Sequence, residues 1–208
     1  MNIVLWADLQ CPFCFAGETN LQHAIEELKI EDQVNMDIKS REIHRPEDGN
    51  GDHEMLEIFQ VKDEFTPEGA KKQIGKINHM IESETGTTVD FGQVRESNDF
   101  NAHRLYKLAR DRGCGQAVRD ALHEAYFIDH KILDDKQTLI EAGMKGGLAR
   151  ETIERMLEEG WYANEVKNDE MEYDALGIES VPYFIIDQEV VPEHLTKEAF
   201  MDVLKRHM

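Results

Sequence analysis

Cys11 and Cys14 lie three residues apart near the start of the 208-residue chain, with Pro12 and Phe13 between them. Residues three apart on a helix share a face, so two such sulfurs are close enough to form a small disulfide ring. A thiol pair of this kind can exchange disulfides, because one thiol attacks a substrate disulfide and the other resolves the mixed disulfide. The spacing therefore predicts a redox-active Cys-Pro-Phe-Cys pair.

The segment around this pair is predicted to be a strand followed at once by a helix. Residues 3–6 form a short apolar run typical of a buried strand, and a helical repeat of apolar residues begins after the cysteines. If Cys11 is the N-cap, Pro12 falls at the first helical position, where its missing N–H costs nothing. The free amides and the helix dipole then favour the ionised form of Cys11. Cys14 is shielded one turn inside the helix, so we predict that Cys11 attacks and Cys14 resolves.

A pair of cysteines with this spacing also forms half of a zinc site in many proteins. The sequence has no second C-x-x-C and no close Cys/His pair to supply the other ligands, so we expect no bound metal. The third cysteine, Cys114, lies between two glycines. We expect it to be an inert loop thiol, with a regulatory disulfide as the alternative.

The composition is that of an acidic globular protein. Its 43 acidic and 23 basic residues give a formal net charge of −20, which argues against nucleic acid and anionic membrane surfaces as partners. The hydrophobic fraction of 40% is enough for a core, and the length fits one large domain or two small ones. No export signal and no membrane-spanning run is recognisable, and three cysteines suit a reducing compartment. We therefore expect a cytoplasmic protein.

Strand and helix patterns divide the chain into two predicted domains. Residues 1–43 have a β-α-β pattern and residues 161–208 an α-β-β-α pattern. Residues 44–160 contain helical repeats with short links and form a helical insertion domain, which a polar, turn-rich break at 44–52 introduces. Residues 151–174 hold nine acidic and two basic residues, which predicts a solvated face.

Two motifs resemble those of the DsbA-like thiol:disulfide oxidoreductase family and follow the same order along the chain. They are the cysteine motif after the first strand and Val181-Pro182 before a later strand. Further stretches resemble the FrnE-like branch of that family, namely residues 98–104, 125–129 and 176–178. The resemblance covers nearly the whole chain. It implies an α/β fold, a thioredoxin-like fold interrupted by an all-helical insertion domain. Residues 1–43 and 161–208 would then form one discontinuous thioredoxin-like domain, and residues 44–160 the insertion.

The resemblance also implies roles for residues near the cysteines. In the family, the proline at the position of Pro182 is cis and packs beside the cysteine pair. The backbone of the preceding residue, here Val181, pairs with an extended substrate. Phe13 is a further candidate substrate contact. His103 and Asn98 belong to a segment that the family places at the cleft, so they are candidates too, although a histidine on a helix is more often a packed or capping residue.

The activity that the resemblance implies is thiol–disulfide exchange on protein, peptide or small-molecule disulfides. It requires no cofactor beyond the Cys11–Cys14 disulfide, and glutathione is a candidate co-substrate. In a reducing cytoplasm the pair rests as a dithiol, which favours reduction or isomerisation over net oxidation.

The active-site motif departs from the family at two positions. Relatives often carry tryptophan at the position of Phe13 and a basic residue at the position of Glu18, and DsbA has a histidine between its cysteines that stabilises the thiolate. Phe13 cannot donate a hydrogen bond, and Asp8 and Glu18 add negative charge nearby. We therefore expect weaker stabilisation of the Cys11 thiolate than in DsbA.

Two other functions are alternatives. Glutathione-dependent isomerases and transferases of the 2-hydroxychromene-2-carboxylate isomerase and kappa types share the helical insertion. They carry serine at the position of Cys11 and usually lack the resolving cysteine. The alternative of another class is a chaperone-like module that binds unfolded chains and whose cysteines are incidental.

Overall fold

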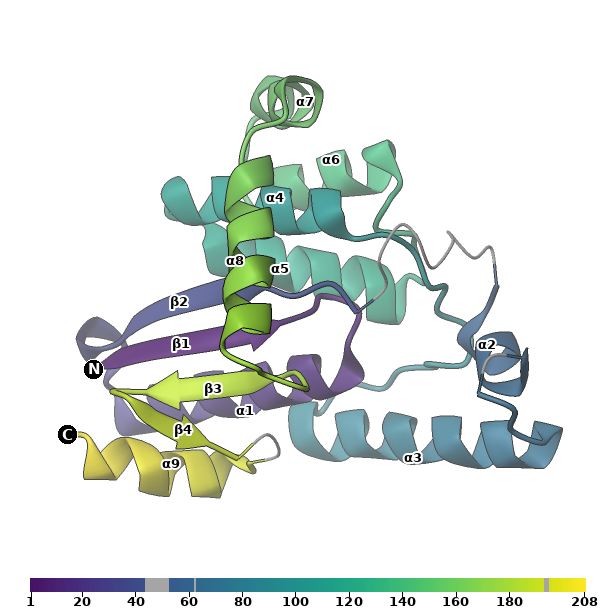
Figure 1. Ribbon diagram of the computed structural model, residues 1–208, viewed down its shortest axis with the longest axis horizontal. Coiled ribbons are helices and arrows are strands. Elements are labelled where there is room, and N and C mark those ends of the chain that lie inside the picture. The colour runs from purple at the N-terminus through teal and green to yellow at the C-terminus, as the bar shows by residue number, and fades with distance from the viewer. Residues whose placement is uncertain (44–52, 62, 193–194) are drawn as a thin grey trace.

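A four-stranded mixed sheet packs against the helix that begins at the cysteine motif (Figure 1). The structure is a computed structural model, and it describes residues 1–43, 53–61, 63–192 and 195–208. The break predicted at 44–52 lies outside the described residues. In the described part of the chain, no helix has the length and apolarity needed to cross a membrane. The elements follow in the order β1 (Asn2–Ala7), α1 (Pro12–Leu28), β2 (Asn35–Ser40), α2 (Met55–Val61), α3 (Pro67–Thr85), α4 (Phe100–Asp111), α5 (Gly115–His123), α6 (Lys136–Lys145), α7 (Arg150–Glu159), α8 (Ala163–Ala175), β3 (Tyr183–Ile186), β4 (Glu189–Val191) and α9 (Lys197–Arg206).

The strands lie in the order β2-β1-β3-β4. β1 pairs with β2 in parallel, and the crossover between them is α1; β3 pairs antiparallel with both β1 and β4. Asp187 and Gln188 connect β3 to β4 with φ angles of 43° and 77°, a backbone that suits a two-residue hairpin. The β-α-β and α-β-β-α patterns predicted for the two ends of the chain are therefore confirmed.

Alternate residues of β1 face two different layers. Ile3 and Leu5 pack into a core with α1 and α9, whereas Trp6 packs against Tyr173 of α8 on the other face. The Trp6 indole N–H also donates a hydrogen bond to the Asp169 carbonyl at 3.2 Å. Figure 1 shows α8 crossing in front of the sheet, with α1 behind it. Both faces of the sheet are therefore covered by helices. Four residues separate the end of β1 from the start of α1, so the cysteine motif lies at that edge of the sheet.

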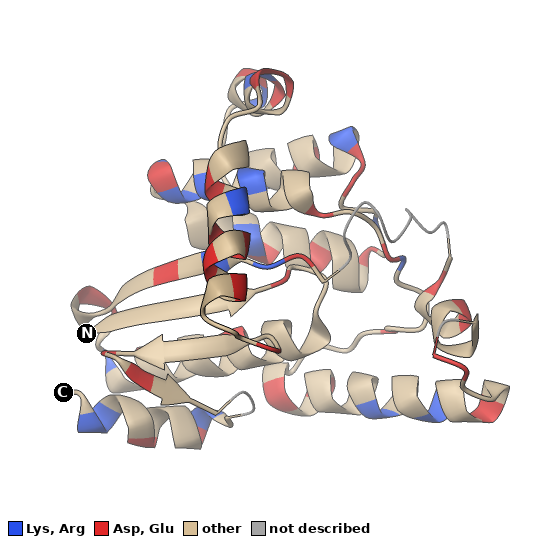
Figure 2. Ribbon diagram, viewed as in Figure 1, with Lys and Arg blue, Asp and Glu red and all other residues tan. Residues whose placement is uncertain are grey.

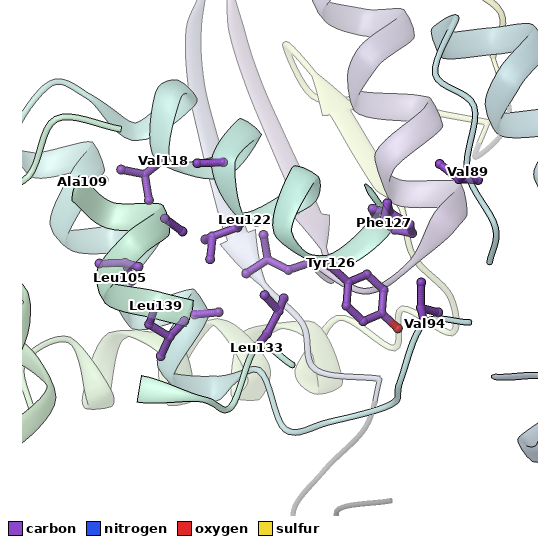
Figure 3. Close-up of a cluster of buried hydrophobic side chains, with 14 of the residues drawn as sticks. Val89, Val94, Leu105, Ala109, Val118, Leu122, Tyr126, Phe127, Leu133 and Leu139 are labelled. Atoms are coloured by element: carbon purple, nitrogen blue, oxygen red, sulfur yellow. The ribbon is translucent and has the colours of Figure 1, made fainter. Parts of the chain in front are cut away.

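The helical segment between β2 and α8 has a core of its own. Figure 3 shows part of this core, with side chains from α4, α5, α6 and the π-helical turn at Glu124–Ile128 that continues α5. Leu9, just before the cysteines, is buried in the same core. The cysteine loop is thus packed between the sheet and the helical segment. The domain boundaries at residues 43/44 and 160/161 stay predictions.

Most acidic residues of the run at 151–174 are exposed, as its composition predicts, but Asp169 is buried and Glu170 is half-buried. Asp169 of α8 is buried and lies 2.5 Å from the Nζ of Lys107, and Glu170 pairs with Arg41 at 2.7 Å. Figure 2 shows mainly acidic positions along α8 where it crosses the sheet. Because α8 packs against β2 and α4, its acidic side chains pair with Lys107 of α4 and with Arg41, which directly follows β2.

Candidate functional site

Cys11 is the N-cap residue of α1, as the sequence predicts. Its backbone is extended (φ −79°, ψ 118°), and Pro12 is the first residue of the helix. The Cys14 N–H donates a hydrogen bond to Cys11 Sγ at 3.3 Å, and the Phe15 N–H donates one to the Cys11 carbonyl at 3.0 Å. The Cys11 sulfur therefore occupies the place of a capping oxygen at the start of α1.

The two sulfurs of the motif differ in their surroundings. Cys11 is 4% exposed and Cys14 is completely buried, and both are free thiols. Burial, followed by the hydrogen bond and charge of Cys11 and then the charge of Glu18, raises the pKa of the Cys14 thiol well above its usual range. Near neutral pH, Cys14 is therefore an uncharged thiol. Cys114 is half-buried and free, directly before α5.

The loop before β3 lies beside the cysteines. The peptide bond between Val181 and Pro182 is cis, and the Val181 carbonyl oxygen lies 4.0 Å from Cys11 Sγ. On α1, a Cβ atom added to Gly17 would lie 3.4 Å from Pro182 Cγ and 3.2 Å from Phe184 Cζ. Glycine at this position therefore allows α1 to approach the proline and β3 closely.

A pocket of about 490 Å³, lined mainly by apolar side chains, lies next to Cys11. Phe13, which is 37% exposed, forms part of its wall. Asp63 and Glu96 are acidic residues in the lining. The helical segment supplies most of the apolar wall, through Met55, Ile58, Phe59, Ile77 and Phe91. The sequence interpretation missed these residues: the spacing of Met55, Ile58 and Phe59 indicates a helix face, but no local signal says that this face meets the cysteines.

His103 and Asn98 do not belong to the lining of this pocket. His103 is 1% exposed, and its Nε2 lies 3.5 Å from an oxygen of Asp99. Asn98 donates a hydrogen bond to Glu42 at 2.9 Å and accepts one from the Phe100 N–H at 3.2 Å. These contacts hold the start of α4 in place, and the substrate-binding roles expected for the two residues stay predictions.

A buried polar cluster lies behind the cysteine loop. Asp8 accepts hydrogen bonds from the backbone N–H groups of Gln10 and Ile43, each at 2.6 Å. Burial, followed by the charge of Asp99, raises the pKa of Asp8 from 3.8 to about 7. Among the described residues, Asp8, Asp99 and His103 form a group whose ligand atoms lie within 4.8 Å of one another, close enough to hold a cation.

The charges that the sequence places near Cys11 are compensated in the fold. Arg119 of α5, which is fully buried, binds both carboxylate oxygens of Glu18. Asp8, with a pKa of about 7, is only partly ionised at neutral pH. Arg119 lies 101 residues from Glu18 in sequence, so the sequence gives no local signal of this pairing. The weaker stabilisation of the Cys11 thiolate than in DsbA stays a prediction.

The buried carboxyl of Asp8 predicts that the fold loses stability as the pH rises. The pKa of Asp8 in the folded protein, about 7, lies above the ordinary value of 3.8, so the folded state binds more protons than the unfolded state between these values. The stabilising contribution is complete below about pH 4 and is lost as the pH rises through 7. We expect Asp8→Asn to reduce the decline of unfolding free energy between pH 4.5 and 8, measured by chemical denaturation.

Glu179→Gln is the matched control, because it removes a carboxylate from an exposed position. It should keep the pH slope of the wild-type protein. Equal slopes for wild type and Asp8→Asn would show that Asp8 does not carry a raised pKa.

Comparison with known proteins agrees with this arrangement. The model of the family described as DSBA-like thioredoxin domain matches residues 2–205. The crystal structure of a probable DsbA oxidoreductase from Streptomyces coelicolor superposes with a TM-score of 0.87 at 26% sequence identity, over 99% of this chain and 89% of that chain. A search of curated protein sequences gives no significant match.

Two structures of lower sequence identity also share the fold. The cytosolic disulfide reductase DsbM from Pseudomonas aeruginosa has a TM-score of 0.63 at 13% identity, over 100% of this chain and 98% of that chain. A 2-hydroxychromene-2-carboxylate isomerase has a TM-score of 0.65 at 10% identity, over 100% of this chain and 94% of that chain. Together with the family match, these likenesses confirm the predicted fold, a thioredoxin-like α/β fold with a helical insertion. The chain belongs to the DSBA-like thioredoxin domain family.

Proposed function

We propose that this protein catalyses thiol–disulfide exchange, with Cys11 as the attacking sulfur and Cys14 as the resolving sulfur. One observation carries the proposal: Cys11 Sγ caps α1 and accepts the Cys14 N–H at 3.3 Å, next to a pocket that a substrate can enter. Membership of an oxidoreductase family supports it. Within that family, we assign the chain to the FrnE-like branch on the stretches at 98–104, 125–129 and 176–178.

The reaction takes two exchange steps. The Cys11 thiolate attacks one sulfur of the substrate disulfide, the substrate S–S bond breaks, and the other substrate sulfur leaves as a thiolate that takes up a proton. Cys14 then loses its proton to solvent and attacks Cys11 Sγ, which forms the Cys11–Cys14 disulfide and releases the second substrate thiol. The substrate gains two electrons and the cysteine pair loses two. A dithiol, or two molecules of glutathione, restores the reduced pair.

The surroundings of Cys11 suit an extended substrate with an apolar side chain. We propose that the backbone of Val181 pairs with the substrate next to the reacting sulfur, with Pro182 packed beside the pair. The apolar pocket beside Phe13 would take a neighbouring substrate side chain. Protein or peptide disulfides fit this description.

We propose the reductase or isomerase direction in a cytoplasmic setting, because a reducing glutathione pool keeps such a pair in the dithiol form. The cytosolic disulfide reductase DsbM has also been crystallised with glutathione, at a TM-score of 0.65 to this chain. This supports glutathione as a candidate recycling thiol here.

Insulin reduction in the presence of dithiothreitol tests the proposal. Wild type should precipitate the insulin B chain faster than dithiothreitol alone, and a variant with both Cys11→Ser and Cys14→Ser should not. The same two proteins are compared for suppression of aggregation of an unfolded client. If both proteins suppress client aggregation equally and wild type does not reduce insulin, the result would favour the chaperone-like alternative and contradict the proposed exchange.

A further inference from the structure

An ion pair between Glu18 and Arg119 lies one helical turn beyond Cys14. Glu18 follows Cys14 by four residues on α1, so the two side chains share a face of the helix. Arg119 of α5 donates hydrogen bonds from Nε and Nη2 to the two oxygens of Glu18. The Arg119 side chain is 1% exposed and the Glu18 side chain 11%. A buried two-point pair thus joins the helical segment to the helix that carries the resolving sulfur.

Arg119 has one nitrogen that this pair does not use. Among the described residues, Nη1 finds no hydrogen-bond partner, although it is buried. The guanidinium carbon lies 5.3 Å from the centre of the Tyr106 ring, so an aromatic face covers part of the group. An unused buried donor is unfavourable in a purely structural salt bridge. The unpaired Nη1 indicates that the Arg119 guanidinium can interact with a further negatively charged group.

The titratable rings near this pair carry little charge near neutral pH. Burial lowers the pKa of His123 well below its ordinary value and also lowers the pKa of His103. Burial raises the pKa of Tyr106 to about 12. Asp8, with its pKa of about 7, is partly ionised. Glu18 of the ion pair is the carboxylate that acts most strongly on the resolving thiol.

Both members of the ion pair act on Cys14. Glu18 contributes to the raised pKa of Cys14, after burial and Cys11. Burial by itself lowers the pKa of Arg119, but Glu18, followed by Tyr106 and the Cys14 sulfur, holds it above its ordinary value. The guanidinium is held on Glu18, one helical turn from Cys14 on the same face of α1, so its positive charge favours a Cys14 thiolate.

We propose that Arg119 is the counter-charge of the Cys14 thiolate in the resolving step, and that Glu18 orients the guanidinium and moderates its charge. The inference rests on the proposed exchange at Cys11 and Cys14. In that step the Cys14 proton goes to solvent, a bond forms between the two cysteine sulfurs, and the bond from Cys11 to the substrate sulfur breaks. Arg119 and Glu18 are positioning residues, since they contact neither substrate nor the bond that breaks.

A single-turnover reaction with dithiobis-nitrobenzoate separates the two steps, because each step releases one coloured thiolate. All variants are made with Cys114→Ser, so that the third thiol does not contribute. Glu18→Gln should increase the Cys14 thiolate about tenfold, if removal of the carboxylate lowers the pKa of Cys14 by about one unit. The lower nucleophilicity of that thiolate offsets part of the gain, so the second release should be about three- to fourfold faster at pH 7. The pH profile of the second release should move to lower pH.

Arg119→Gln should slow the second release, and Arg119→Lys, which keeps the charge, should recover part of the rate. Glu26→Gln is the matched control, since it removes the same charge from an exposed position on α1. A second release in Glu18→Gln that matches wild type and Glu26→Gln at every pH would overturn the proposal. If the pH profile of the second release is shifted in Glu18→Gln but the wild-type protein fails to reduce insulin, the ion-pair role is supported and only the proposed function is rejected. Insulin reduction with an unshifted second release would reject the ion-pair role alone.

Discussion

Cys14→Ser is expected to leave substrate covalently attached to Cys11. A serine hydroxyl cannot displace the bound sulfur, so the mixed disulfide that Cys11 forms has no internal route to resolution. Insulin turnover should fall to the rate of dithiothreitol alone. On non-reducing gels a protein–insulin adduct should accumulate, and reductant should release it. Mass spectrometry of the trapped adduct should assign the attachment to residue 11.

Cys11→Ser should form no adduct and should also lose turnover. Cys14 cannot replace Cys11, because it is completely buried and burial, followed by Cys11, raises the pKa of its thiol. Once Cys11 is replaced, the thiol remains buried within the helix. Cys114→Ser serves as the control and should reduce insulin at the wild-type rate, since that thiol lies before α5, away from the pocket lining. Full turnover by Cys11→Ser would remove the basis for assigning the attack to residue 11.

Lys107→Met is expected to lower the free energy of unfolding by about 3–5 kcal/mol, because it leaves a buried carboxylate without its cation. Lys107 Nζ lies 2.5 Å from Asp169 and donates a hydrogen bond to the Ile38 carbonyl at 3.1 Å. The same Asp169 oxygen accepts the Ser40 N–H at 2.9 Å. This network joins α4, α8 and β2, so its loss affects the packing of the helical segment on the sheet. Urea unfolding monitored by circular dichroism gives the measurement.

Two controls separate the charge effect from the loss of a large side chain. In the double variant Lys107→Met with Asp169→Asn, the asparagine oxygen can still accept the Ser40 N–H and no unpaired charge remains, so part of the stability should return. Lys136→Met removes one partner of an exposed pair at 3.4 Å and should change stability by less than about 1 kcal/mol. A Lys107→Met protein as stable as Lys136→Met would contradict the buried-pair interpretation.

Local signals were sufficient for much of the fold. A threonine followed by proline is a local signal of a helix start, and at α3 Thr66 Oγ1 accepts the Gly69 N–H at 3.1 Å. Thr196 caps α9 in the same way, by accepting the Ala199 N–H at 3.3 Å. Cys11 as N-cap with Pro12 following belongs to the same class of signal. In each case the donor, the acceptor and the backbone geometry lie within four residues, so the sequence contains the whole interaction.

Local sequence signals did not indicate which residues surround the cysteines. The Met55–Phe59 wall of the pocket and Arg119 reach the site only through tertiary packing, and their partners lie tens of residues away. Asp169 in the acidic run at 151–174 shows the same limit: the composition of the run predicts a solvated face, but this one carboxylate is buried against Lys107 of α4. A charge count gives the number of carboxylates and says nothing of the cations that pair with them.

Redox equilibration of wild type with glutathione, at a series of ratios of reduced to oxidised glutathione, tests the cysteine pair most directly. After acid quenching and alkylation, mass spectrometry reports which cysteines are joined. We predict one two-electron transition in which Cys11 and Cys14 form a disulfide while Cys114 stays alkylated throughout. Cys11 and Cys14 that remain alkylated at every ratio, or a disulfide that includes Cys114, would contradict the proposed redox pair.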